Sequence, residues 1–83
     1  MREEPNAIAT ELFEALRSFR SATAKDQGVP AYVIAPNRTL AEIAAARPRT
    51  ATDLESIHGM GPARIAAYGE GLLAIVVAHG STT

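Results

Sequence analysis

The sequence contains no cysteine and no tryptophan, and its aromatic side chains are limited to two phenylalanines and two tyrosines. Without cysteine there is no disulfide framework, no thiolate metal site and no cysteine nucleophile. The longest mainly apolar run, residues 72–78, is too short to span a bilayer, and the N-terminus lacks the apolar segment of a secretory signal. These absences favour a soluble, cytoplasmic protein.

An excess of positive charge is also missing. Eight Lys and Arg are set against nine Asp and Glu, which gives the 83 residues a formal net charge of −1. Because a dedicated nucleic-acid binder is usually basic, any contact with nucleic acid would depend on a local patch of cations. The length predicts one small domain with a modest core, and the abundant alanine favours helices over strands.

Patterns typical of catalysis are lacking as well. His58 and His79 are far apart in the sequence and lie in no metal-ligand spacing. We interpret His58 as an ordinary turn residue, with a phosphate contact as the alternative, and His79 as a last-turn residue that favours the helix dipole. The carboxylates mostly occupy caps, first turns or solvent faces. The sequence therefore predicts no catalytic residue, no metal site and no cofactor in this domain.

The spacing of apolar residues predicts an all-α fold of five helices joined by short connections. The expected helices cover about residues 6–27, 39–47, 52–57, 62–68 and 70–79, within a domain that spans residues 6–80. Residues 1–5 are expected to be a disordered or vector-derived start, and residues 81–83 a tail.

The longest expected helix begins at Asn6, whose side chain can cap it, and ends at Gly28. Its cations Arg17, Arg20 and Lys25 are expected to lie off the buried face. That face is expected to consist of Ile8, Leu12, Ala15, Leu16, Phe19 and Ala22, which recur at helical spacing.

Prolines flank the segment that follows. Pro30 and Pro36 disfavour a regular helix, because each pushes the residue before it towards extended angles. We expect an ordered connector in which Val33 or Ile34 turns into the core. The ring of Tyr32 either packs against the domain or remains available for binding.

Two segments have the form of a capping box, namely Thr39-Leu40-Ala41-Glu42 and Thr52-Asp53-Leu54-Glu55. In each, the threonine is expected to cap a helix and the glutamate to reach back to it. Near the C-terminus, Tyr68-Gly69 is expected to separate the last two helices, with the tyrosine ring packed between them.

A glycine turn, Gly59-Met60-Gly61, precedes Pro62, which suits the first position of a helix. It is no Walker loop, because no Gly-Lys-Ser/Thr follows, and no dinucleotide fingerprint, because no strand precedes it. It matches the hairpin of helix-hairpin-helix DNA binders, whose N–H groups face a phosphate. Two interpretations remain open: a structural corner between helices, or a phosphate contact at Gly59 and Gly61.

Several motifs in a fixed order resemble the HRDC domain, a module named for its place at the C-terminus of RecQ-type helicases and of ribonuclease D. The motifs are Leu12-Phe13-Glu14-Ala15-Leu16-Arg17, Val29-Pro30-Ala31-Tyr32-Val33-Ile34, Thr39-Leu40, Arg47-Pro48-Arg49-Thr50, Leu54, Ile57, the glycine turn and Tyr68-Gly69. The resemblance covers about residues 8–79, and within the family the sequence is most similar to the domain of a bacterial RecQ helicase.

The resemblance implies a compact five-helix bundle of the HRDC type with a helix-hairpin-helix-like glycine turn. It also implies a non-catalytic accessory module that binds single-stranded or branched DNA weakly and tunes the substrates of an ATP-dependent DNA helicase active in DNA repair and recombination. Carried over by position, Tyr32 is the aromatic that would stack on a base. The expected nucleic-acid-binding residues are Tyr32, Arg17, Arg20, Lys25, Arg38, Arg64, Gly59 and Gly61.

Two other functions remain open at this point. Arg64 is the single cation in the helix after the glycine turn, and the net charge is negative. A module that docks on its own helicase or on another protein therefore remains an alternative to DNA binding. In that case an acidic stretch of the first helix, or Asp53 and Glu55, would face a basic partner. A C-terminal domain that positions RNA in a ribonuclease D-like exonuclease is the third. The isolated domain is expected to be a monomer that does not contact membranes.

Overall fold

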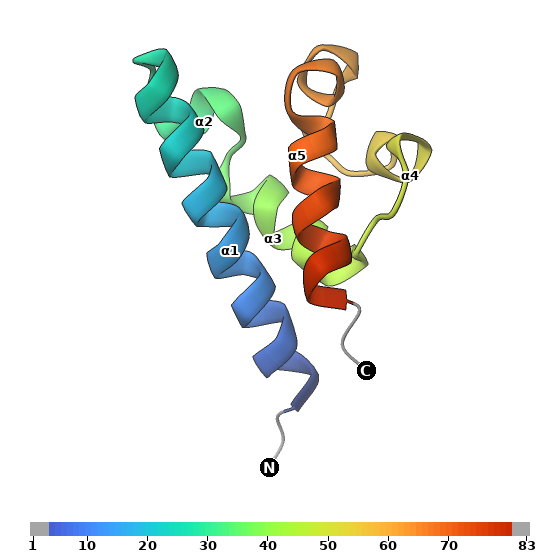
Figure 1. Cartoon of the computed structure of the whole chain (residues 1–83). Coiled ribbons are helices and arrows are strands. Elements are labelled where there is room, and N and C mark those ends of the chain that lie inside the picture. Colours follow the sequence, from blue (N-terminus) through green and yellow to red (C-terminus); the bar gives the residue numbers. More distant parts are fainter. Residues whose placement is uncertain (1–3, 81–83) are drawn as a thin grey trace.

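The computed structural model describes residues 4–80, which form five helices and no strand within that range. The helices are α1 (Glu4–Gln27), α2 (Ala31–Ile34), α3 (Asn37–Ala46), α4 (Ala51–Glu55) and α5 (Pro62–Gly80). Figure 1 shows α1 and α5 as the two long helices, which run in opposite directions with α3 between them, while α4 lies beside α5. The predicted all-α bundle is confirmed. Within the described range, no helix has both the length and the hydropathy that a bilayer span requires.

The first helix begins earlier than predicted. Residues 1–3 and 81–83 lie outside the described part of the chain, so most of the expected start and all of the expected tail do as well. Glu4 and Pro5 belong to α1, which begins two residues earlier than expected. Asn6 therefore lies in the first turn of α1 and is not its cap.

All five helices contribute apolar side chains that are 0–1% exposed; α2 contributes Ile34. The other four helices contribute Leu12 and Leu16 of α1, Leu40 and Ile43 of α3, Leu54 of α4 and Leu72 of α5. Residues four apart lie on one face of a helix, and Arg20 and Ala24 continue the buried row of α1. The prediction that Arg20 lies off the buried face is thus wrong, and Ala22, which was expected on that face, is exposed.

The C-terminus of α1 is closed as the sequence predicts. Gly28 has φ +69°, a left-handed conformation that glycine adopts at no steric cost. The N–H of Val29 donates to the carbonyl of Ala24 (3.0 Å), and the N–H of Gly28 donates to the carbonyl of Lys25 (3.2 Å). This pair of bonds is the Schellman arrangement, which satisfies the last carbonyls of the helix.

The expected break at Tyr68-Gly69 is wrong, because α5 continues through it without interruption. The glycines of α5 serve close packing instead. A Cβ at Gly69 would lie 3.3 Å from Cδ1 of Leu54, and a Cβ at Gly71 would lie 2.7 Å from the ring of Phe19. Glycine costs a helix interior about 1 kcal/mol relative to alanine, but here it lets α4 and α1 approach α5 closely.

The segment between the two prolines is more regular than predicted. The segment between Pro30 and Pro36 contains one helical turn, α2, where a connector was expected; Ile34 is buried as expected and Val33 is exposed. Ala35, which precedes a proline, is extended (φ −169°, ψ 134°), as the sequence indicates. The total of five helices therefore holds, but with α2 added and the last two expected helices merged.

Neither expected capping box forms. α3 begins at Asn37, so Thr39 lies inside it and is buried. α4 is capped by Thr50, whose Oγ1 accepts from the N–H of Asp53 (3.1 Å), and Thr52 lies within the helix. The cap is therefore two residues earlier than predicted. Thr50 and Thr52 each stand three residues before an acidic side chain, so the sequence pattern fits both positions.

Candidate nucleic-acid interface

The glycine turn is a tight corner between α4 and α5 that lies against α3. Gly59 has φ +93°, and a Cβ at this position would clash with the side chain of Thr39. The hydroxyl of Thr39 donates to the carbonyl of His58 (3.0 Å), and the N–H of His58 donates to Oε2 of Glu42 (3.3 Å). α3 thus holds both backbone groups of His58, and Pro62 opens α5 as predicted.

Tyr32 lies on α2 and, at 67%, is the most exposed large hydrophobic side chain among residues 10–79. Its neighbour Val33 is 41% exposed, whereas Ile34 is 1% exposed and anchors the turn in the core. The N–H of Val33 donates to the carbonyl of Pro30 (3.0 Å), and that of Ala35 donates to Ala31 (3.3 Å). The exposed ring therefore projects from an ordered helical turn.

Arg64 joins the glycine turn to α2. Its Nη1 donates to the carbonyl of Gly59 (2.9 Å), and its Nη2 donates to the carbonyls of Tyr32 and Val33 (3.3 Å each). Three carbonyls from two segments that are more than twenty-five residues apart in the sequence thus share one guanidinium. The structure thereby brings together Tyr32, Arg64 and Gly59, three of the residues that the sequence singled out.

Arg20 reaches the same region from α1. It is 8% exposed, and its Nη1 donates to the carbonyl of Ala35 (3.0 Å), directly after α2. Burial lowers the pKa of the Arg20 guanidinium, and the positive charge of Arg17 lowers it further. Nε of Arg20 is buried with no hydrogen-bond partner. Arg20 therefore presents little surface to a phosphate and mainly contacts the backbone beside Tyr32.

A family model described as the HRDC domain matches residues 9–76, most of the chain. The chain belongs to the HRDC family. A structure titled "D. radiodurans RecQ HRDC domain 3" superposes with a TM-score of 0.85 at 38% identity and covers 89% of this chain and 97% of that one. The fold and the family expected from the sequence are both confirmed.

Curated relatives of this HRDC domain are DNA helicases. The ATP-dependent DNA helicase RecQ of Bacillus subtilis is 38% identical over 73 residues, and the ATP-dependent DNA helicase UvrD2 of Mycobacterium tuberculosis is 41% identical over 69 residues. These matches cover 88% and 83% of this chain but only 12% and 10% of the relatives. The chain therefore spans about a tenth of the length of these helicases.

The other predicted cations of the HRDC domain are spread out. Lys25 lies in the last turn of α1 and Arg38 in the first turn of α3, and both are exposed. Arg17 is eight residues before Lys25, about 12 Å along the helix. Its Nη1 donates to both carboxylate oxygens of Glu14 (3.0 and 3.3 Å), so its charge is partly neutralised.

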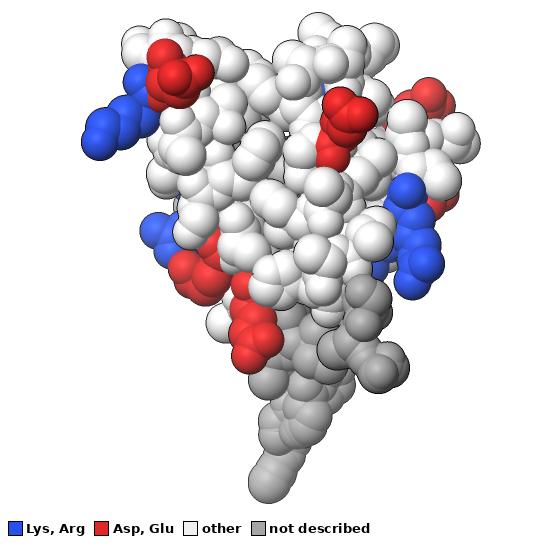
Figure 2. Space-filling model, viewed as in Figure 1, with Lys and Arg blue, Asp and Glu red and all other residues white. Residues whose placement is uncertain are grey.

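Figure 2 shows the charge distribution on the face formed by α1 and α5. Blue and red side chains are both present around its periphery, and its centre is largely uncharged. Among the described residues of this face no continuous positive patch forms. On this face, therefore, the positive charges are not gathered in one place.

Tyr68 makes a contact that the sequence did not indicate. It lies within α5, packs partly against the core, and its hydroxyl hydrogen-bonds with Oε1 of Gln27 (3.2 Å) at the end of α1. Its ring does not lie between two separate C-terminal helices, as was expected, because α5 is continuous. The bond joins residues 41 positions apart, for which no local pattern exists.

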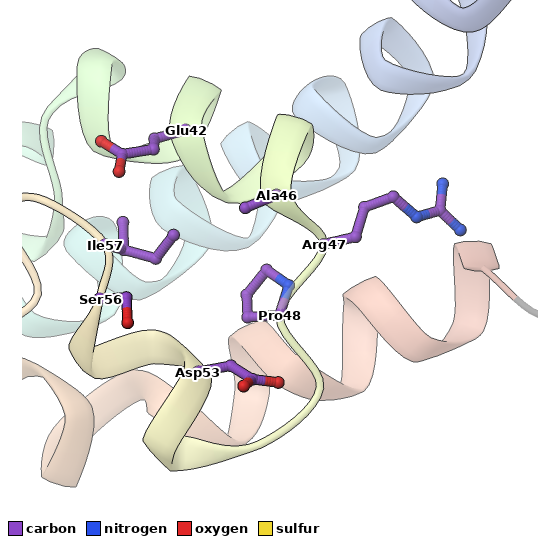
Figure 3. A pocket seen from close by; sticks show the side chains of 7 residues that line it. All are labelled: Glu42, Ala46, Arg47, Pro48, Asp53, Ser56 and Ile57. Carbon is purple, nitrogen blue, oxygen red and sulfur yellow. The ribbon is translucent and has the colours of Figure 1, made fainter.

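A separate hollow lies between α3 and α4, and Figure 3 shows the side chains that line it. It is lined by Glu42, Ala46, Arg47, Pro48, Asp53, Ser56 and Ile57, with Arg47 extending away from the others. Within residues 4–80 no group of three His, Cys, Asp or Glu side chains is placed to hold a metal ion. The hollow contains neither Tyr32 nor Arg64, so it is distinct from the candidate interface.

Proposed function

We propose that this HRDC domain is an accessory DNA-binding module of a RecQ-like ATP-dependent helicase, which binds single-stranded or branched DNA weakly and tunes substrate choice. The observation that carries this proposal is the 67% exposure of the Tyr32 ring on an ordered turn. A ring presented in this way can stack on any base, which contributes about 1–3 kcal/mol per base. ATP hydrolysis and strand separation would belong to other parts of such a helicase.

In this proposal the phosphates meet Lys25 and Arg38, which are exposed on either side of α2 in the sequence, with Arg17 as a more distant contact. Backbone N–H groups of the glycine turn at Gly59 and Gly61 add a further contact at the start of α5. So few cations predict micromolar or weaker affinity that falls steeply with salt.

The test is a titration of a fluorescently labelled single-stranded oligonucleotide with the wild-type domain and with Tyr32→Ala. Loss of one stacked base should weaken binding by roughly 5- to 150-fold. Tyr32→Phe keeps the ring and should bind as the wild type does, which separates stacking from the hydroxyl. Equal affinity of wild type and Tyr32→Ala would contradict the proposal.

A second function, docking on the helicase or on another protein without DNA contact, is favoured by the net charge of −1 and by the largely uncharged centre of the face of α1 and α5 in Figure 2. It predicts no DNA binding at low salt and a complex with the purified helicase core in size-exclusion chromatography. The matched relatives are named DNA helicases, which favours a helicase parent over a ribonuclease D-like one.

A further inference from the structure

We infer that Arg64 is a positioning residue: it holds α2, and with it the Tyr32 ring, against the glycine turn, and it is not a principal phosphate ligand. The geometry of its guanidinium carries this inference. Both terminal nitrogens donate to backbone carbonyls, Nη1 to Gly59 and Nη2 to Tyr32 and Val33. A planar fork can serve several acceptors at once, which a single ammonium cannot match in this arrangement.

α2 needs such a support. It has four residues, its N-cap is Pro30, and no side chain caps it. A single isolated turn is unstable in water, because helix nucleation fixes several residues for one hydrogen bond. Carbonyls at the C-terminal end of a helix carry partial negative charge, and a cation beside them is favourable. Arg64 supplies this cation from α5, and Arg20 supplies a second one from α1 through Ala35.

The consequence for binding is preorganisation of the ring. A Tyr32 that moves freely would lose conformational freedom when a base stacks on it, and this loss weakens binding. With α2 held by Arg64, that ordering has occurred before DNA arrives. This part of the inference rests on the proposed function, whereas the support of α2 by Arg64 does not.

Substitution by lysine separates positioning from phosphate binding. A phosphate ligand tolerates Arg64→Lys, because the charge remains. A positioning residue does not, so Arg64→Lys should weaken single-stranded DNA binding about as much as Arg64→Ala, roughly five- to tenfold. The slope of log affinity against log salt should stay at the wild-type value in both variants, since no phosphate contact is lost.

Arg38 is the matched control, because it is an exposed cation that makes no hydrogen bond to a backbone carbonyl among the residues that the structure describes. Arg38→Ala should reduce the salt slope by about 0.7, the value for one contact to a single strand, and Arg38→Lys should restore it. Wild-type affinity in Arg64→Lys, or a loss of slope in Arg64→Ala equal to that in Arg38→Ala, would overturn the inference.

A measurement without DNA tests the support of α2 directly. The amides of Val33 and Ala35, which bond within the turn, should exchange at least about tenfold faster in Arg64→Lys, while α3 amides keep their protection. In a Tyr68→Phe background Tyr32 is the sole tyrosine, and its fluorescence anisotropy should fall in Arg64→Lys.

The two proposals fail in different ways. Unchanged exchange and anisotropy in both Arg64 variants would overturn the positioning role, whether or not the domain binds DNA. Faster exchange in a domain that binds no oligonucleotide would support the positioning role and contradict the proposed function.

Discussion

α2 and α4 are both single helical turns, but they are stabilised in opposite ways. α4 is capped by its own neighbours: Thr50 accepts from the N–H of Asp53, whose Oδ2 accepts from the N–H of Arg49 (3.0 Å). α2 has no capping side chain, and the carbonyls at its end accept from Arg20 and Arg64, which are 15 to 32 residues away. One turn is thus specified within five residues and the other by two distant helices.

The difference between α2 and α4 indicates which short helix can carry a binding surface in a small helical bundle. α4 buries Leu54 and completes the core, whereas α2 buries Ile34 and leaves Tyr32 exposed. Because long-range arginines support α2, its outer residues are not needed for its stability and remain available for a ligand. The following variants test this contrast, beginning with the largest expected effect.

Leu54→Ala should lower the free energy of unfolding by about 2–5 kcal/mol, because a fully buried side chain leaves a cavity beside Gly69. Urea denaturation of the isolated domain measures this. Glu55→Ala, which changes an exposed residue of the same turn, should stay within about 0.5 kcal/mol of the wild type. If Leu54→Ala lowered the free energy of unfolding as little as Glu55→Ala does, α4 would not be anchored in the core.

Gly59→Ala should cost roughly 2–4 kcal/mol, because the left-handed conformation becomes strained and the new methyl group clashes with Thr39. Gly61→Ala is the control, since its Cβ would meet nothing within 4 Å and its φ lies outside the left-handed region. Thermal unfolding of the two variants should therefore differ clearly. Equal midpoints would refute the close approach of the glycine turn to α3.

Thr50→Ala should cost about 1 kcal/mol, the usual effect of removing an N-cap hydroxyl. Thr52→Ala, at the position that the sequence favoured as the cap, should have little effect because Thr52 is exposed within α4. Urea midpoints of the pair decide between the two caps. A larger loss in Thr52→Ala would restore the cap predicted from sequence.

Arg20→Met should change the global free energy of unfolding by only about 1 kcal/mol. The substitution leaves the buried carbonyl of Ala35 without its donor, which is unfavourable. It also removes a buried positive charge, whose burial is unfavourable and lowers the pKa of Arg20, so the two effects largely offset each other. The local effect should be larger: the Ala35 amide, which donates to Ala31, should exchange faster than amides of α4. Loosening of α4 to the same degree would remove the contrast between the two turns.

Much of the fold could be predicted from the sequence because its signals are local. The i, i+4 spacing of Leu12 and Leu16 indicated the buried face of α1, Gly28 marked the end of that helix, and Pro62 marked the start of α5. Arg20 was misplaced although it continues the same spacing, because arginine is seldom buried. The spacing was the signal that could have placed it.

The candidate site was predicted in part. Tyr32 came from the resemblance to the HRDC family, and its exposure agrees with a binding role that remains to be tested. The link from Arg64 to Tyr32 spans 32 residues and has no periodic signature, and neither does the bond between Tyr68 and Gln27. Contacts of this kind form only when separate helices have already packed.

The sequence by itself determined the fold class, the family, the end of α1 at Gly28 and the start of α5 at Pro62, because apolar spacing, glycine and proline act through their own backbone neighbours. Only the tertiary structure decided that Gly69 and Gly71 lie inside one helix, since their purpose is room for Leu54 and Phe19. The tertiary structure also decided that α2 forms, because this turn of four residues has no capping side chain of its own and accepts hydrogen bonds from side chains of α1 and α5.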